Sequence, residues 1–328
     1  MDERPADTRM QVGDDPQALI ARAVLAPSSH NTQPWRFRID EAGVSIHVDP
    51  ARRLPINDPA DRELTISCGC ALMNLRVAAA AAGRAYRLDP LPEGERSSCL
   101  ARLTWRDDAP DAEEASLASG LERRRTVRQR FALSSVTDDE VDALAAMAAQ
   151  EGAQLQVVET SGPRQQVARL VAEGDASLWR DRRWRRELAG WMRPRGRGDG
   201  LAVPAPVLPL ARTMVRLFDL GERVGRHDRQ LAEEAPRLLA LCTKGDERRD
   251  WLEAGQALER VLLAACQLDL QASYLNQPIQ VEALRPRLRA LLGESGQPQI
   301  LLRLGHPRRE LPPVPRRAVA DVIDSPTR

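Results

Sequence analysis

The sequence is poor in several residue types that mark specialised proteins. Of its 48 basic residues only Lys244 is a lysine, and it has three phenylalanines and two tyrosines. So strong a preference for arginine is more typical of a GC-rich coding bias than of a selected basic surface. The net charge is only +1, so bulk electrostatics favour neither nucleic acid nor a membrane as partner.

Membrane spans and metal motifs are also missing from the sequence. No segment approaches the roughly 20 apolar residues of a membrane span, and the charged N-terminus has no apolar core, which predicts a cytoplasmic protein. The five cysteines are Cys68, Cys70, Cys99, Cys242 and Cys266. They form no C-x-x-C pair, and no histidine lies near them in sequence to complete a zinc site. Buried apolar cysteines are therefore favoured over a metal site or disulfides.

What the sequence does contain is an internal repeat. Residues 69–79 read GCALMNLRVAA and residues 255–265 read GQALERVLLAA, so they share the glycine, the Ala-Leu pair and the closing Ala-Ala. Both have a helical period, and each precedes an apolar strand with an Arg-Leu step. Residues 106–120 are polar and proline-bearing, which is typical of a linker. We therefore predict two related units, residues 1–110 and 111–328.

Local patterns place several elements. Trp35, Phe37 and Ile39 alternate with arginines, and after a turn at residues 40–43 a second alternating strand follows, which predicts a hairpin. This alternation places His47 on the polar face of its strand, where we expect it to be exposed. Thr137 begins a helix with a capping box at its start.

The second unit has a segment, residues 171–236, that the first unit does not match. Within it Trp184, Leu188 and Trp191 lie at i, i+4 and i+7, so one helical face is aromatic. Tryptophans amid arginines also occur in nucleic-acid binding arms. Because these aromatics share one stripe, a helix that closes over the body with its arginines outward is the favoured interpretation.

Two polar segments are candidates for ligand binding. APSSHNTQPWRF at residues 26–37 places short neutral donors and acceptors on a loop, which suits a flat ligand with amide-like edges, although a capped turn explains it equally well. GLERRRTVRQRF at residues 120–131 surrounds Thr126 with arginines, which suits a phosphate monoester. A solvated basic helix end is the alternative there. His30 could exchange protons, but it has no partner nearby in sequence, so a positional role is favoured.

These motifs carry a family resemblance. The first loop resembles the A-P-S-x-x-N-x-Q-P-W motif of the FMN-dependent nitroreductase superfamily, and RRRTVRQRF resembles its R-R-S-x-R-x-F phosphate motif. Further matches, in order, are DPADRELTISCGCALMNLRVAAAAAG, WLEAGQALERVLLAA, SYLNQP, GQPQILLRLGH and VPRRAVADVI. Nearly the entire chain is similar to the Acg-like NAD(P)H nitroreductases, in which two nitroreductase units are fused.

The resemblance implies an α+β protein of the nitroreductase α/β/α type, built as an intramolecular dimer with a helical lid insertion at about residues 171–236. It implies FMN as cofactor, NAD(P)H as electron donor, and a small acceptor such as a nitroaromatic or a quinone. No metal, nucleic acid or membrane partner is expected. A monomer would suffice, and a homodimer stays open.

The resemblance also implies a composite cofactor site. Its residues come from both units: Ser28, Ser29, His30, Asn31, Thr32, Arg124, Arg125, Thr126, Arg128, Asn276, Gln277, Arg316 and Arg317. The second unit reads AAQEGAQLQVV where its own P-S loop should fall, so one of the two pseudosymmetric sites is expected to be vacant. No side chain is expected to be catalytic, because the flavin carries the chemistry.

Two other functions stay open at this point. A catalytically silent protein that stores or sequesters FMN under the lid is the alternative within the family resemblance. An arginine-rich nucleic-acid binder is a weaker third, and strong salt dependence of binding would be expected of it.

Overall fold

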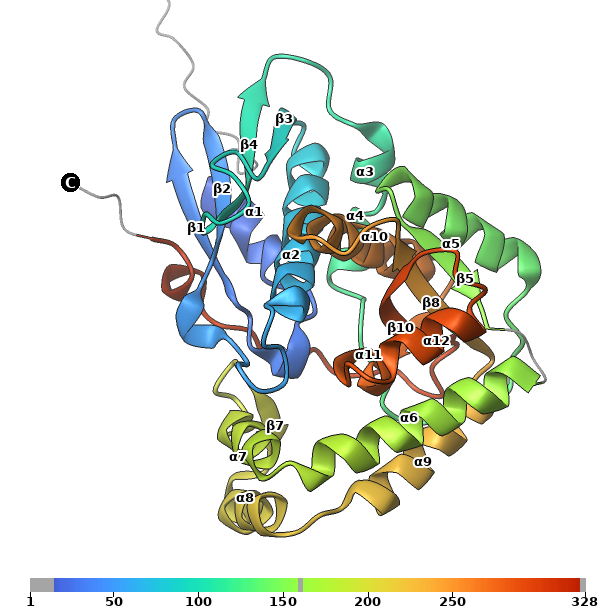
Figure 1. The fold of residues 1–328 in the computed structure, drawn as a ribbon. Helices are drawn as coiled ribbons and strands as arrows, with labels where there is room; N and C mark the ends of the chain where they lie inside the picture. Colours follow the sequence, from blue (N-terminus) through green and yellow to red (C-terminus); the bar gives the residue numbers. More distant parts are fainter. Residues whose placement is uncertain (1–14, 159–161, 325–328) are drawn as a thin grey trace, which may run out of the picture.

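The computed structural model describes residues 15–158 and 162–324, so most of the charged N-terminal segment lies outside the described residues. Two four-stranded antiparallel sheets form the body (Figure 1). The first has the order β1-β2-β4-β3 and the second the equivalent order β5-β8-β10-β9. Their strands are β1 (Trp35–Asp40), β2 (Gly43–Val48), β3 (Ala85–Pro90), β4 (Cys99–Arg106), β5 (Gln154–Val157), β8 (Arg237–Thr243), β9 (Gln271–Tyr274) and β10 (Gln297–Gly305).

Helices occupy equivalent positions in the two units. One precedes each first strand, α1 (Pro16–Ala23) and α5 (Asp138–Gln150), and a long one joins each second and third strand, α2 (Arg62–Ala81) and α10 (Arg248–Gln267). The short helices α3 (Ala112–Ser116) and α4 (Ala118–Leu121) connect the units, and α11 (Gln277–Gln280) and α12 (Arg285–Leu291) join β9 to β10. The same order of elements therefore occurs twice, which confirms the predicted α+β fold of two fused, related units.

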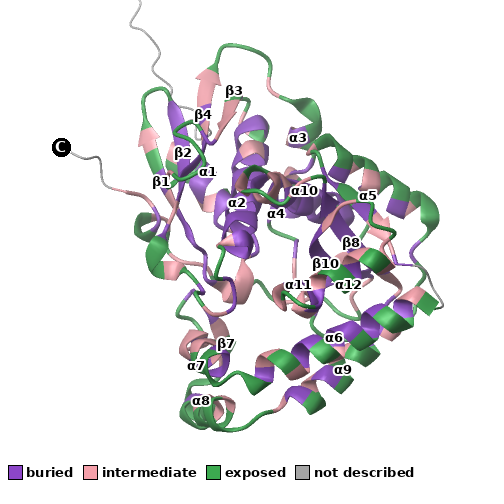
Figure 2. Ribbon diagram, in the orientation of Figure 1, coloured by how far each residue is buried: buried purple, intermediate pink, exposed green. Residues whose placement is uncertain are grey.

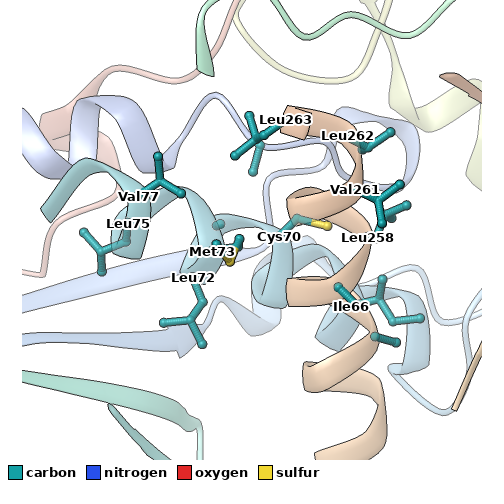
Figure 3. Packing of buried hydrophobic residues seen from close by; sticks show 14 of the residues in the cluster. Ile66, Cys70, Leu72, Met73, Leu75, Val77, Leu258, Val261, Leu262 and Leu263 are labelled. Carbon is teal, nitrogen blue, oxygen red and sulfur yellow. The ribbon is translucent and has the colours of Figure 1, made fainter. Parts of the chain in front are cut away.

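Helices α2 and α10 cross at the two glycines that the sequence repeat aligns. A Cβ added to Gly69 would lie 2.8 Å from the Cα of Gly255, and one added to Gly255 would lie 2.7 Å from the Cα of Gly69. No other residue permits so close an approach of the two backbones. Around the crossing, Figure 3 shows buried side chains of both helices packed together: Ile66, Cys70, Leu72, Met73, Leu75, Val77, Leu258, Val261, Leu262 and Leu263. The repeat thus lies at the contact between the units.

Two expectations from the sequence are wrong. Within the described residues one helix, α2, is long and apolar enough to span a membrane, but 89% of its most apolar stretch is buried inside the protein. Its length of apolar sequence reflects a helix that the core surrounds on most sides. His47 is only 4% exposed and lies 2.9 Å from the Ser45 hydroxyl. Strand β2 lies between β1 and β4 with both faces covered, so the polar side of its alternation is buried too.

Other local expectations are confirmed. Strands β1 and β2 form the predicted hairpin, with Trp35 opposite Val48. Thr137 and Glu140 form the capping box of α5. All five cysteines are free and buried. These features depend on neighbours close in sequence, which is why the sequence alone indicates them.

The second unit carries an insertion, residues 158–236, between β5 and β8, where the first unit has a tight hairpin turn. It begins before residue 171 because its first helix follows β5 almost at once. Its elements are α6 (Gly162–Arg180), α7 (Arg182–Trp191), β6 (Met192–Pro194), β7 (Leu201–Val203), α8 (Leu208–Leu217) and α9 (Gly221–Glu233). In Figure 1, α6 and α9 lie side by side below the second unit, whereas α7 and α8 lie below the first.

The tryptophans of the insertion are engaged with the body. Trp184 is buried, its indole Nε1 donates to Asn57 Oδ1 at 2.8 Å, and its ring meets Trp179 edge to face at 5.6 Å. Trp191 has the guanidinium groups of Arg52 and Arg193 5.5 and 5.4 Å from its ring centre. These contacts match the favoured interpretation of a helix closing over the body, and they leave these rings poorly placed to stack on nucleic-acid bases.

The chain after β10 returns to the first unit. The Phe37 amide donates to the Val322 carbonyl at 2.8 Å, and the Asp324 amide donates to the Phe37 carbonyl at 2.9 Å. The C-terminal segment therefore extends along β1. The second unit is thus connected to the first both at its start, through the linker, and at its end, through these hydrogen bonds.

Candidate functional site

The polar loop, residues 28–33, connects α1 to β1 in an unusual backbone conformation. His30, Asn31 and Gln33 have φ angles of 52°, 54° and 52°. Side chains other than glycine rarely adopt this left-handed region, and such positions concentrate at functional sites. The Ser28 hydroxyl accepts a hydrogen bond from the Gln33 amide at 3.0 Å, which helps to hold the loop in this form.

Glu63, which belongs to neither sequence motif, connects the polar loop to the second unit. Its carboxylate is 3% exposed and accepts from the Ser29 hydroxyl at 2.7 Å and from Gln280 Nε2, on α11, at 2.9 Å. Asn57 Nδ2 donates to it at 3.4 Å. The only available signal was an acidic residue in the first turn of an otherwise apolar helix.

Arg124 of the second unit reaches the end of α1 in the first. Its Nη2 donates to the Leu25 carbonyl at 3.0 Å, and its Nε lies 3.3 Å from Glu259 Oε1. Glu259 is fully buried on α10, and burial raises its pKa to about 7 although Arg124 opposes this. Glu259 was not among the predicted site residues, because its only signal in the sequence is a lone acid on an apolar helix face.

The two C-terminal arginines, Arg316 and Arg317, contact the chain between the end of α1 and the start of β1. Arg316 donates to the carbonyls of residues 24–26 at 3.0 to 3.1 Å. Burial, with the neighbouring Arg124, lowers the pKa of Arg316 to about 9. The backbone amide of Arg317 donates to Gln33 Oε1 at 3.0 Å, and its Nη1 donates to the Gln33 carbonyl at 3.2 Å. Of the predicted basic pair, Arg316 thus lies against the end of α1 and Arg317 against the polar loop.

The remaining residues of the arginine motif differ in their surroundings. Arg125 donates to the Glu122 carbonyl at 2.6 Å and to the Leu311 carbonyl at 3.2 Å. Thr126 forms an isolated parallel β-bridge with Ala272 of β9. Arg128 is exposed and makes no side-chain hydrogen bond or ion pair within the described part of the chain.

His30 of the polar loop lies close enough to Arg128 of the arginine motif for the two groups to interact electrostatically. Burial lowers the pKa of His30 to about 4; Glu63 opposes this shift, and the charge of Arg128 adds to it. His30 is therefore neutral near pH 7. The buried Arg303 helps to fix the backbone of the arginine motif, because its guanidinium donates to the Val127 carbonyl at 3.2 Å.

Asn276 and Gln277 have separate partners. Asn276 Oδ1 accepts from the Leu301 amide at 2.9 Å. Gln277 Nε2 donates to Asp228 Oδ2 at 2.9 Å and to Asp175 Oδ1 at 3.2 Å, on two helices of the insertion. Burial, with the neighbouring charge of Asp228, raises the pKa of Asp175 to about 7. Gln277 therefore connects the insertion to the second unit.

The insertion also lies directly on the polar loop. Gln33 Nε2 donates to the Gly198 carbonyl at 2.7 Å, and Gly200 donates through its amide to the Asn31 carbonyl at 3.1 Å. Asp199, between the two glycines, forms an ion pair with Arg52 of the first unit at 2.6 Å. Thr32 is buried in the same contact, and its carbonyl accepts from Arg52 Nε.

The pseudosymmetric position in the second unit contains no such loop. Helix α5 passes through a tight turn at Glu151 and Gly152 directly into β5. Nearby, Arg76 of α2 contacts Glu151 at 2.6 Å and Glu114 at 2.5 Å, and Arg260 contacts Glu151 at 3.2 Å. An ion-pair network therefore occupies this position, and the two halves of the protein are not equivalent.

The assembled site combines neutral polar groups from one unit with guanidinium groups from the other. Such a set can bind an anion at the arginines and a planar, amide-edged ring at the loop. Among residues 15–158 and 162–324 there is no group of three or more His, Cys, Asp and Glu side chains able to hold a metal.

Curated relatives cover almost the whole chain. It is 33% identical over 319 residues to "Putative NAD(P)H nitroreductase Rv3131" of Mycobacterium tuberculosis H37Rv, covering 94% of this chain and 91% of that protein. It is 28% identical to "Putative NAD(P)H nitroreductase acg" of the same strain, covering 94% of each. "Probable NAD(P)H nitroreductase PigM" of a Serratia species is 25% identical, covering 92% and 91%. No family model matches the chain.

Solved structures show weaker similarity. The FMN and NADPH-dependent nitroreductase NfnB from a strain described as sphigopyxis is 20% identical, with a TM-score of 0.41, covering 64% of this chain and 99% of that one. A nitroreductase with bound FMN from Bacteroides fragilis is 14% identical, with a TM-score of 0.36, covering 58% and 88%.

Proposed function

Because the chain belongs to the family of Acg-like NAD(P)H nitroreductases, we propose that it is an FMN-dependent oxidoreductase. In this proposal NAD(P)H is the electron donor, and the acceptor is a small oxidised molecule such as a nitroaromatic or a quinone. The observation that carries the proposal is the composite site. Arg124 of one unit contacts the Leu25 carbonyl beside the polar loop of the other at 3.0 Å.

The arginine side of the site fits the phosphate of FMN. Arg124, buried at 5% exposure, has an Nη1 without a hydrogen-bond partner in the described structure, and Arg128 has no partner there either. Arg316 is a further cation beside Arg124, and Glu259 is the carboxyl group that opposes these two. A phosphate dianion would relieve this excess of positive charge through charge-assisted hydrogen bonds.

The polar loop fits the ring side of the cofactor. Its hydroxyl and amide groups match the N–H and C=O edges of a flavin without a buried charge, and the low pKa of His30 keeps that side chain neutral. When bound, FMN supplies the redox chemistry. The residues of this chain would grip the phosphate, orient the ring and exclude water under the insertion, and none is proposed as an acid or base.

A specific observation favours a second candidate function. The insertion is bonded to the polar loop through Gln33 and Asn31 and paired with Arg52. If this contact persists with FMN bound, it would hinder access of nicotinamide. The second candidate is therefore a protein that stores or sequesters FMN without turnover.

One experiment separates the two candidates. The FMN-loaded protein is mixed anaerobically with NADH or NADPH, and the visible flavin absorbance is followed. Bleaching within seconds supports the reductase, whereas a colour that only dithionite bleaches supports storage. A protein that does not take up FMN at all would refute both.

The compartment and assembly are parts of the same proposal. Five free, buried cysteines are consistent with a reducing cytoplasm. Both sides of the site belong to one chain, so a monomer is proposed as the functional unit.

A further inference from the structure

Helix α8 and its flanks expose an apolar surface that the proposed oxidoreductase function does not use. The α8 stripe consists of five side chains: Val207, Leu210, Met214, Leu217 and Phe218. They are five of the eight large apolar side chains that are exposed in the described structure, and Leu210 and Leu217 are 66% and 67% exposed. Figure 2 shows α8 exposed at the outer edge of the insertion. A cluster of this kind marks an interaction surface.

The stripe is not the inward face of the helix. Leu208 is buried, and Ala211 and Val215 pack with it against Met192. Leu210, Met214 and Leu217, at i, i+4 and i+7, lie on another face. Helix α8 therefore has one apolar face that packs within the insertion and a second that is largely exposed to solvent.

The stretch of sequence that contains the stripe is strongly positive. Residues 180–230 contain thirteen arginines and six carboxylates, a net charge of +7, whereas the whole chain carries +1. The rest of the chain is therefore net negative, at −6. A coding bias explains arginine in place of lysine, but it does not explain this excess over carboxylates in one segment.

Many of these arginines are available for binding. Seven are exposed and make no side-chain hydrogen bond or ion pair within the described residues: Arg180, Arg182, Arg183, Arg186, Arg195, Arg216 and Arg223. Two of them flank the stripe closely in sequence, Arg216 within α8 and Arg223 at the start of α9.

We propose that the α8 stripe docks the protein on an anionic lipid surface, with its apolar side chains in the acyl boundary and the surrounding arginines at the headgroups. An amphipathic helix with basic neighbours is the usual form of such a contact. A second copy on this face would bring two segments of +7 together, which like-charge repulsion opposes. A nucleic acid would satisfy the arginines but would leave the aliphatic stripe without an apolar partner.

Vesicle flotation of the full-length, FMN-loaded protein tests the proposal. We expect binding to phosphatidylcholine vesicles with about one third phosphatidylglycerol, weakening as salt rises, and little binding to phosphatidylcholine alone. Leu217→Gln should weaken binding about tenfold, because it removes an apolar side chain that would enter the acyl boundary. Arg216→Ala should weaken it about fivefold, since each basic residue near the surface contributes about 1 kcal/mol.

Leu133→Gln is the matched control, because Leu133 is 99% exposed and lies outside the stripe. It should bind vesicles like the unchanged protein, and all variants should keep their flavin absorbance and unfolding midpoint. Absence of binding, equal binding to neutral vesicles, or equal losses in Leu133→Gln and Leu217→Gln would overturn the proposal. A dimer in light scattering that Leu217→Gln dissociates would assign the stripe to a second copy instead.

Discussion

The carboxyl group of Asp175 makes a measurable prediction about the base of the insertion. It is 4% exposed, shares the Gln277 amide with Asp228, and has a pKa raised by burial to about 7. Against an ordinary value of about 3.9, this difference corresponds to about 4 kcal/mol of destabilisation of the charged native state. Solvent screening and local relaxation reduce the expected effect to about 2 kcal/mol.

The sign follows from proton binding. The native state of Asp175 binds a proton more tightly than the unfolded state, so this group lowers stability as pH rises from about 4 to about 7. Asp175→Asn removes the charge, keeps an oxygen that accepts from Gln277, and adds a donor near the unpartnered Gln277 Oε1. We therefore expect the variant to gain about 2 kcal/mol in the free energy of unfolding at pH 8 and almost nothing near pH 4.

Urea unfolding at both pH values measures the effect. Asp107→Asn, at an exposed carboxylate that makes no ion pair in the described structure, is the control and should change stability little at either pH. A gain of the same size at pH 4 and pH 8 would contradict the electrostatic explanation. So would an unchanged or lower stability of Asp175→Asn at pH 8.

Three further predictions concern the contact between the units. Gly255→Ala should lower the free energy of unfolding by about 3 kcal/mol or more in thermal or urea unfolding. The reason is that the added Cβ would lie 2.1 Å from a carbonyl oxygen of α2. Gly190→Ala is the control and should be neutral or slightly stabilising, because its Cβ meets nothing within 4 Å. Gln33→Ala should speed tryptic cleavage in residues 195–197, since it removes a bond from the insertion, and unchanged cleavage would show that other contacts hold it. Ser28→Ala and Arg124→Ala, in different units, should each weaken FMN binding about tenfold in calorimetry; if only one does so, the composite site is wrong.

The local elements could be read from the sequence because they depend on neighbours along the chain. The hairpin of β1 and β2, the capping box at Thr137 and the helical period of both long helices need only short-range patterns. The internal repeat also indicated a contact between residues far apart in sequence. It aligned Gly69 with Gly255, and these glycines proved to lie at the crossing of the two units.

The candidate site was only partly visible in the sequence. The polar loop and the arginine motif stood out because several polar residues lie together in each. Glu63 and Glu259 did not, since each is a single acid in an apolar helix. Their meaning comes from partners far along the chain, Ser29 and Gln280 for Glu63 and Arg124 for Glu259. The contribution of each predicted residue to cofactor binding stays a prediction.

Residue order and spacing were enough to indicate several helices and strands, the twofold repeat and the two motifs. The packing of the units was needed to see that His47 is buried, that Gln33 holds the insertion, and that Arg124 reaches the end of α1. Burial and long-range hydrogen bonds depend on which surfaces meet when two units pack. That packing is cooperative over the whole core, so no local window of sequence specifies it.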